Sequence, residues 1–313
     1  MTRAQQLLAD LGLPPGDRHD LPASGLRFPD DAHYRIEIPS VEGPAALRAV
    51  IEEAHRRGVP IHRVSQGSGM MLLTDGEIRD MALMGNECGV EVCLFVGPRA
   101  PWEGTGQALT PDGKLFGWRH TGMDQLRYAL EDVLRGVELG IRSILVADEG
   151  LLWLVHQAKL AGKLPAELVI KGSALLGAAN PVGIRLLAEA GMTTINVASD
   201  ISPARLAALR QVVAIPVDLY IESPDGLGGF TRYYEMPELI RVGAPIYLKF
   251  GLRNAPNIYP SGIHLEQAAV LSGRERVRRA AIALELLARA DTGFVASQPG
   301  AAGPGIPVVP RTD

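Results

Sequence analysis

The chain contains very little cysteine, and this limits the cofactors that it can bind through thiolates. Its 313 residues include two cysteines, Cys88 and Cys93. Two thiols cannot form a framework of several disulfides. They also cannot by themselves supply the four thiolates of a structural zinc or iron–sulfur site. We therefore expect no iron–sulfur cluster, and no other cofactor is evident from the sequence.

Long apolar runs and a strong net charge are also missing. No stretch approaches the roughly 20 apolar residues that a membrane-spanning helix needs. Residues Met1 to Leu8 contain one arginine and no apolar core, so they do not resemble a secretory signal. A formal net charge of −4 produces only a weak electric field. We expect a cytoplasmic protein that binds neither membrane nor nucleic acid; a homo-oligomer is left open.

A repeated alternation of strand and helix patterns is present from residue 34 onward. In the segment Ile246–Phe250, three apolar residues alternate with Tyr247 and Lys249, which is the period of a strand. The eight expected strands are Tyr34–Ile38, Pro60–Ser65, Val90–Val96, Ser143–Ala147, Leu168–Ile170, Thr194–Ala198, Val217–Ile221 and Ile246–Phe250. Helical patterns follow them, and several begin at cap residues such as Thr74 and Asn180.

Eight strand–helix units predict an α/β fold of the (β/α)8 TIM-barrel class. We expect a single barrel domain over residues 34–290, an N-terminal extension over 1–33 and a flexible C-terminal tail over 291–313. The alternative is a doubly wound open sheet, which should carry a glycine-rich dinucleotide motif after its first strand. The segment Ser65–Gly69 is glycine-rich, but it comes too late and lacks that spacing.

The connection over residues 97–121 is long for a compact domain, and we interpret it as a lid. In barrels of this class the active site lies at the carboxyl ends of the strands. Polar residues near these ends and in the adjoining loops are therefore the candidates. The expected catalytic residues are Glu37, Glu222, Lys171, Lys249 and His120. The expected substrate-binding residues are Gln66, Arg99, Asp148, Ser173, Asn196, Arg253 and Asn254.

The inward-facing charges each allow two interpretations. Glu37 and Glu222 are suited to general acid–base catalysis or to binding a divalent metal together with Asp148, but they are equally suited to internal salt bridges. Lys171 and Lys249 could form a Schiff base, although binding a substrate carboxylate or phosphate is favoured. Because Glu222 and Lys249 end adjacent strands, we expect their side chains to meet.

The segment from Ser143 to Tyr220 resembles peptidase family U32, the collagenase-like peptidases. The shared features are the strand end Asp148-Glu149-Gly150-Leu151-Leu152, Ser173, the helix start Asn180-Pro181, and the run Asn196 to Ser202. The resemblance implies a barrel-like core and assigns site positions to Asp148, Ser173 and Asn180. Better-understood members resemble iron–sulfur hydroxylases with four cysteines after the strand that corresponds to Val217–Ile221. This chain has Glu222-Ser223-Pro224-Asp225 there, so cluster and hydroxylation are not implied.

Two classes of function follow. The first is a bacterial-type metabolic enzyme, a hydrolase or lyase that acts on a small anionic or peptide substrate by acid–base or metal-assisted chemistry. A variant of it is a class I aldolase-type lyase that uses a Schiff-base lysine. The second class is a catalytically silent barrel that serves as a ligand-binding module or complex subunit. Charges paired in the middle of the barrel favour the second class, whereas carboxylates at its mouth favour the first.

Overall fold

The computed structural model describes residues 2–17, 20–97, 106–290, 292–301, 303 and 305–309, with the side chains of residues 115 and 116 left aside. Eight parallel strands close into a barrel in sequence order, and β1 pairs with β8. The strands are β1 (Tyr34–Pro39), β2 (Arg63–Ser65), β3 (Glu91–Phe95), β4 (Ser143–Val146), β5 (Val169–Gly172), β6 (Thr194–Asn196), β7 (Val217–Glu222) and β8 (Ile246–Phe250). The predicted (β/α)8 barrel is therefore confirmed.

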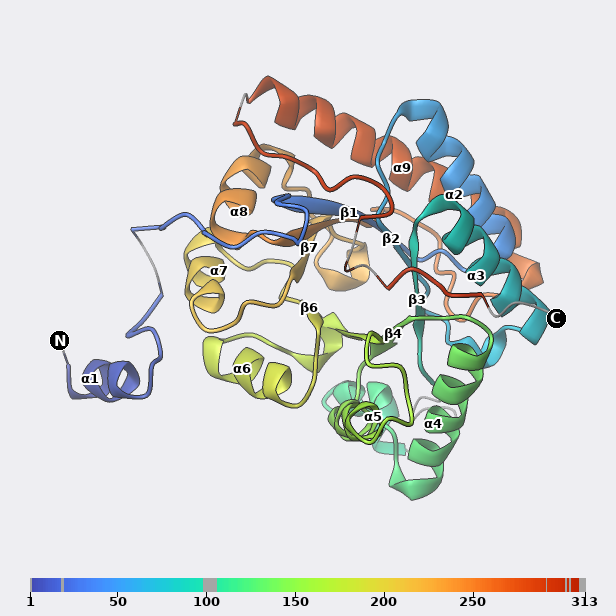
Figure 1. Ribbon diagram of the computed structural model, residues 1–313, viewed down its shortest axis with the longest axis horizontal. Helices are drawn as coiled ribbons and strands as arrows, with labels where there is room; N and C mark the ends of the chain where they lie inside the picture. The colour runs from blue at the N-terminus through green and yellow to red at the C-terminus, as the bar shows by residue number, and fades with distance from the viewer. Residues whose placement is uncertain are drawn as a thin grey trace.

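Helices surround the barrel, as Figure 1 shows. They are α2 (Pro44–Arg57), α3 (Asp75–Cys88), α4 (Gly122–Glu138), α5 (Glu149–Leu160), α6 (Pro181–Glu189), α7 (Pro203–Arg210), α8 (Met236–Gly243) and α9 (Glu266–Arg289), and one more helix, α1 (Arg3–Asp10), precedes the barrel. The capping box of α3 is confirmed, since Thr74 and Glu77 each accept a hydrogen bond from the other's backbone N–H. Asn180 likewise caps α6, with Pro181 at its first position. No described helix combines the length and apolar composition needed to cross a membrane.

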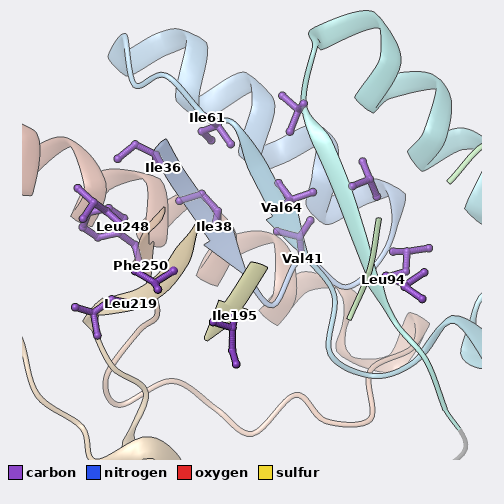
Figure 2. Close-up of a cluster of buried hydrophobic side chains, with 14 of the residues drawn as sticks. Ile36, Ile38, Val41, Ile61, Val64, Leu94, Ile195, Leu219, Leu248 and Phe250 are labelled. Carbon is purple, nitrogen blue, oxygen red and sulfur yellow. The ribbon is translucent and has the colours of Figure 1, made fainter. Parts of the chain in front are cut away.

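The hydrophobic core lies between the outer face of the barrel and the helices. The strands supply it with alternate residues, including Ile36, Ile38, Leu219, Leu248 and Phe250, all fully buried (Figure 2). Because successive side chains of a strand point to opposite faces, the intervening residues of the same strands point into the barrel interior. On β1 these are Arg35 and Glu37, and on β8 they are Tyr247 and Lys249. This division brings polar side chains from every side of the barrel together around its axis.

The two ends of the chain meet the barrel differently. Helix α1 contributes no buried residue and lies apart from the barrel in Figure 1. Downstream of α9, Ala296 forms a parallel bridge with Tyr34, and Val308 N donates to Gly140 O at 2.9 Å. The described part of residues 292–309 thus makes backbone contacts with the barrel, and the flexibility predicted for residues 291–313 stays a prediction. The domain boundaries near residues 33 and 291 stay predictions.

Candidate functional site

Six charged side chains meet inside the barrel, and we call them the interior ion cluster. Its members are Glu37 (β1), Arg63 (β2), Glu91 (β3), Lys171 (β5), Asp218 (β7) and Lys249 (β8). The most exposed of them, Lys249, is only 4% accessible to solvent. Three cations are therefore packed against three carboxylates where water is almost excluded, and such charges need close partners to be tolerated.

Glu37 lies at the centre of the interior ion cluster. Its carboxylate contacts Lys171 Nζ and lies 3.2 Å from Lys249 Nζ and 3.4 Å from Arg63 Nη1. The Ser65 hydroxyl donates a hydrogen bond to it at 2.7 Å. Burial by itself would raise the pKa of Glu37, but the three cations hold the pKa well below its usual range. Glu37 is therefore an ionised, fully paired carboxylate.

Arg63 extends the cluster toward the amino end of the barrel. Its Nη1 pairs with Asp218 Oδ1, and its Nε lies 2.8 Å from Glu91 Oε1. The guanidinium stacks 3.6 Å from the centre of the Tyr247 ring. Thr194 Oγ1 donates to the other oxygen of Asp218 at 2.6 Å. Burial nevertheless raises the pKa of Asp218, because the cost of excluding water outweighs the attraction of the cations.

A cavity of about 620 Å³ opens at the carboxyl ends of the strands, and we call it the mouth cavity. Its polar lining includes Ser173, Asn196, Tyr220, Lys249, Tyr259 and Arg276. The volume is typical of sites for small molecules. Since Lys249 belongs both to the lining and to the interior ion cluster, the cluster lies directly beneath the cavity. The position matches the active-site end of this barrel class.

Lys249 connects the cluster to the cavity. Its Nζ donates to Asn196 Oδ1 at 2.8 Å and lies 4.5 Å from the centre of the Tyr220 ring. The amide of Asn196 is in turn oriented by the Gly172 carbonyl, to which Nδ2 donates at 2.7 Å. The sequence predicted roles for both Lys249 and Asn196, and the structure brings them together at the floor of the mouth cavity.

Arg276 is a lining residue that the sequence interpretation missed. It comes from α9 rather than from a strand, and it is 4% exposed. Its Nη1 lies 3.4 Å from Ser40 O, and its Nε has no hydrogen-bond partner among the described residues. Burial lowers its pKa. One signal was available: Arg276 interrupts the apolar period of α9 beside the buried Val277 and Ala280.

The predicted pair of Glu222 and Lys249 is wrong. The pairing of β7 with β8 is irregular between Tyr220 and Glu222, so the alternation that would point Glu222 inward is lost. The carboxylate instead accepts a hydrogen bond from the Tyr233 hydroxyl and another, at 3.1 Å, from Arg253 N. Tyr233 lies outside the barrel, beside α9. Glu222 is not among the residues that line the mouth cavity.

Glu37 and Lys171 face inward as predicted, but they lie below the mouth cavity rather than on its surface. Both side chains are completely buried, and neither lines the cavity. Lys171 Nζ contacts Glu37 and lies 3.4 Å from Asp218 Oδ1. This arrangement agrees with the internal salt-bridge interpretation of these two residues. Their catalytic roles stay predictions.

His120 and Asp148 lie together at the start of α5. Asp148 caps this helix, because its Oδ1 accepts from Leu151 N at 2.7 Å, while Oδ2 accepts from His120 N at 3.0 Å. Burial alone would raise the pKa of Asp148, but the hydrogen bonds from these partners lower it. The His120 imidazole is buried, and its Nδ1 lies 3.8 Å from the carboxylate. Neither residue lines the mouth cavity.

The remaining substrate-binding candidates divide between the cavity and its rim. Ser173 lines the cavity. Gln66 instead closes a turn through two hydrogen bonds of 3.1 Å with the backbone of Gly69. Asn254 N donates to Asp225 Oδ2 at 2.6 Å, and Arg253 Nε lies 3.5 Å from the same carboxylate. Arg99 lies outside the described residues, as does part of the expected lid over 97–121.

The three possible metal ligands are not brought together. Glu37 lies in the interior ion cluster, Glu222 beside Tyr233, and Asp148 at the start of α5. Within the described ranges, no group of three His, Cys, Asp or Glu side chains is arranged to hold a metal ion. Burial raises the pKa of Cys93 to about 12, so its thiol stays protonated inside the barrel. Binding of a divalent metal stays a prediction.

No protein-family model matches the chain, and no curated protein matches it in sequence. Solved structures do match. A protein named as a fructose-1,6-biphosphate aldolase from Coccidioides immitis is 11% identical, with a TM-score of 0.50, over 83% of this chain and 94% of that one. A 3-deoxy-D-arabino-heptulosonate 7-phosphate synthase from Thermotoga maritima, in truncated form, is 14% identical, with a TM-score of 0.45, over 85% and 90%.

A U32 peptidase is also 14% identical, with a TM-score of 0.42, over 70% of this chain and 93% of that one. Likeness at this TM-score neither supports nor weakens the resemblance that the sequence suggested. Likeness at such low identities shows the barrel fold alone, because this fold carries many unrelated activities. Membership of the U32 family stays a prediction.

Proposed function

We propose that the protein is a barrel enzyme that binds a small organic anion in the mouth cavity. The observation that carries this proposal is the position of Lys249. Its ammonium lies at the carboxyl end of β8 on the cavity surface, and Asn196 and Glu37 hold it in place. Arg276 supplies a second buried cation on the same lining. Buried cations facing a cavity gain most from an anionic ligand, because a ligand replaces the missing water.

The side chains on the cavity surface are suited to acid–base chemistry of the hydrolase or lyase type. Burial raises the pKa of Tyr220, so its phenol stays protonated and can donate a hydrogen bond. A phenol and an ammonium beside a reacting carbonyl or phosphoryl group would stabilise the negative charge that develops on its oxygen. Glu37 would act as a positioning residue, since it contacts Lys249 and does not line the cavity.

A Schiff-base lyase is the second candidate, because Lys249 places an amine on the cavity surface. Schiff-base formation requires the neutral amine. The ion pair with Glu37 at 3.2 Å stabilises the charged ammonium instead, so we favour the role of an anion-binding cation. Borohydride reduction in the presence of pyruvate distinguishes the two. A covalent adduct on Lys249, found by peptide mass spectrometry, would establish the Schiff base.

The binding part of the proposal is tested by calorimetric titration with inorganic phosphate and acetate. Lys249→Met should weaken the binding of these anions roughly tenfold or more, the usual loss for a removed charged hydrogen bond. Lys163→Met, at an exposed position, should bind like the wild type. Equal affinities of the wild type and Lys249→Met for these anions would show that Lys249 does not contribute to the binding site.

Catalysis is tested separately from binding. The protein is incubated with a mixture of carboxylated and phosphorylated metabolites of known composition, and the mixture is analysed by mass spectrometry. A compound consumed by the wild type and spared by Lys249→Met identifies an enzyme. Anion binding without any turnover would instead support the catalytically silent, ligand-binding barrel. A cytoplasmic location, a homo-oligomeric state and membership of the U32 family stay predictions from the sequence.

A further inference from the structure

The mouth cavity has two chemically different walls. Tyr220 and Lys249 come from β7 and β8, and Arg276 comes from α9, which contacts β8 and β1. Phe95 and Leu145 come from β3 and β4, and Trp118 comes from the connection that follows β3. In a closed barrel of eight strands in sequence order, β3 and β4 lie across the axis from β7 and β8. We call Tyr220, Lys249 and Arg276 the cationic wall, and Phe95, Trp118 and Leu145 the apolar wall. The two walls therefore face each other across the cavity.

The cationic wall is built from groups that favour a negatively charged ligand. Lys249 Nζ lies over the Tyr220 ring, and burial raises the pKa of both Tyr220 and Tyr259, which keeps these phenols protonated as donors. Asp225 also lines the cavity. Its carboxylate accepts from Asn254 N at 2.6 Å and lies 3.5 Å from Arg253 Nε, so local partners offset its charge.

The apolar wall offers an aromatic surface. The rings of Phe95 and Trp118 pack edge to face, with centroids 6.2 Å apart and an interplanar angle of 87°. Phe95 is buried and Trp118 is half-buried, so part of the indole is accessible. Leu145, the register partner of Phe95 on β4, also lines the cavity. An aromatic or branched apolar group would bury its surface here, and this burial favours binding.

We infer that the ligand of the mouth cavity is an amphiphilic organic anion. Its carboxylate or phosphate lies against Lys249 and Arg276, and its aromatic or bulky apolar body lies against Phe95 and Trp118. The inference rests on the proposed function, because it assigns the anion to the same cavity. A volume of about 620 Å³ accommodates both parts of such a molecule. Sugar phosphates and other wholly polar anions would bury little apolar surface against Phe95 and Trp118, so this wall would add little to their affinity.

The first test compares five probes by isothermal titration of the wild-type protein. The probes are phenyl phosphate, 3-phenylpropionate, inorganic phosphate, acetate and benzyl alcohol. Each phenyl anion should bind roughly tenfold or more tightly than the corresponding small anion, because the ring buries apolar surface. Benzyl alcohol, which has the ring and no charge, should bind more weakly than either phenyl anion. No detectable binding of the phenyl anions at millimolar concentration would overturn the inference.

The second test assigns the two walls with matched variants. Trp118→Ala should weaken the binding of phenyl phosphate roughly tenfold and leave the binding of inorganic phosphate unchanged. The control Trp153→Ala, at an exposed position on α5, should change the binding of neither. Arg276→Met should weaken both phosphates, whereas Arg278→Met, exposed on the same helix, should not. Thermal melting of each variant confirms that it folds. The comparison of probes on the wild-type protein needs no variant, so it stands even where a variant does not fold.

The outcomes separate this inference from the proposed function. One outcome is that the affinity for inorganic phosphate depends on Lys249 and Arg276 while the phenyl group adds no affinity. In that case the inference of an amphiphilic ligand is wrong, and the proposed anion site is retained. If benzyl alcohol binds as well as phenyl phosphate, or if neither cation affects binding, the anion site itself is wrong.

Discussion

The interior ion cluster and the mouth cavity are neighbouring regions that use the same kinds of residue for different purposes. In the cluster, Glu37 and Lys171 are completely buried and paired with each other. In the cavity, Lys249 and Arg276 present cations to a space that can hold a ligand. Lys249 belongs to both regions. An inward charge on a barrel strand therefore does not by itself indicate function, because its height along the barrel axis decides what it can contact.

The physical difference is the way in which the cost of removing a charge from water is offset. Inside the cluster, oppositely charged side chains offset it, and these contacts are made once on folding. At the cavity, part of the cost of removing Lys249 and Arg276 from water would be offset by a bound ligand. The cluster should therefore govern stability, and the cavity should govern binding. Four expected outcomes test this division.

The largest effect is expected from Glu37→Gln. Removing this carboxylate leaves Lys171 and Lys249 without their shared counter-ion, and losing one partner of a buried ion pair costs about 3–5 kcal/mol. Denaturant unfolding measures the loss. Glu52→Gln, which removes a half-exposed partner of Arg274, is the control and should cost about 0–1 kcal/mol. A Glu37→Gln protein as stable as the wild type would mean that the cluster is not a stabilising network.

A smaller effect is expected from pH, at the amino end of the barrel. His62 accepts from Ile36 N at 2.9 Å and contacts Ser297 O at 2.7 Å, and burial lowers its pKa from 6.5 to about 4. Between these values the unfolded chain binds a proton that the folded protein does not, so stability falls as the pH decreases. At pH 5 the loss relative to pH 7 is about 2 kcal/mol.

The control for this prediction is His62→Gln, which removes the titrating group. Burial raises the pKa of Glu42 and Asp218, and these carboxyls act in the opposite direction over part of the same range. The difference between the unfolding free energies of the wild type and His62→Gln isolates His62. A difference that does not change between pH 7 and pH 5 would show that His62 is not buried in its neutral form.

Glu222→Gln should have a modest effect on stability and none on the cavity. The amide oxygen can still accept from Tyr233 or Arg253 N, so the loss should be about 1 kcal/mol, comparable to one weakened hydrogen bond. Binding of phenyl phosphate should be unchanged, because Glu222 does not line the mouth cavity. If the Glu222→Gln protein is stable but no longer binds the anion, Glu222 contributes to the binding site.

The smallest change in stability is expected from Arg276→Met. The Nε of Arg276 lacks a partner among the described residues, and an apolar side chain of similar length avoids the cost of burying the charge. The free energy of unfolding should therefore stay within about 1 kcal/mol of the wild type while anion binding weakens. A destabilisation as large as that of Glu37→Gln would place Arg276 with the structural charges.

Local patterns were sufficient for the fold and for part of the site. The period of two on β1 and β8 correctly turned Glu37 and Lys249 inward, and the cap residues Thr74 and Asn180 correctly marked helix starts. Ser173 and Asn196, which the sequence proposed as substrate-binding residues near strand ends, line the mouth cavity, and their binding role stays a prediction. These features depend on neighbours in the chain, so they can be recognised without knowledge of the tertiary structure.

The local pattern failed where a side chain's surroundings depend on another element. The irregular pairing between β7 and β8 removed Glu222 from the barrel interior, and no residue pattern within β7 indicated it. Arg276 reaches the cavity from the helix α9, whereas Tyr220 and Lys249 reach it from the strands β7 and β8. Tyr259 reaches it from the loop after β8, where its hydroxyl contacts Ser40 Oγ.

The alternation of apolar and polar residues therefore specified eight strand–helix units, and hence the barrel, because burying one face of each strand is a local requirement repeated along the chain. The positions of Lys171 and Lys249 relative to the mouth cavity were decided only by tertiary structure, since both follow the same inward pattern. Strand register sets Glu37 beside Lys249, and barrel closure brings Lys171 across from β5 to the same carboxylate. Register and closure are properties of neighbouring strands, which is why only the assembled barrel shows that Lys171 is sealed and Lys249 faces the cavity.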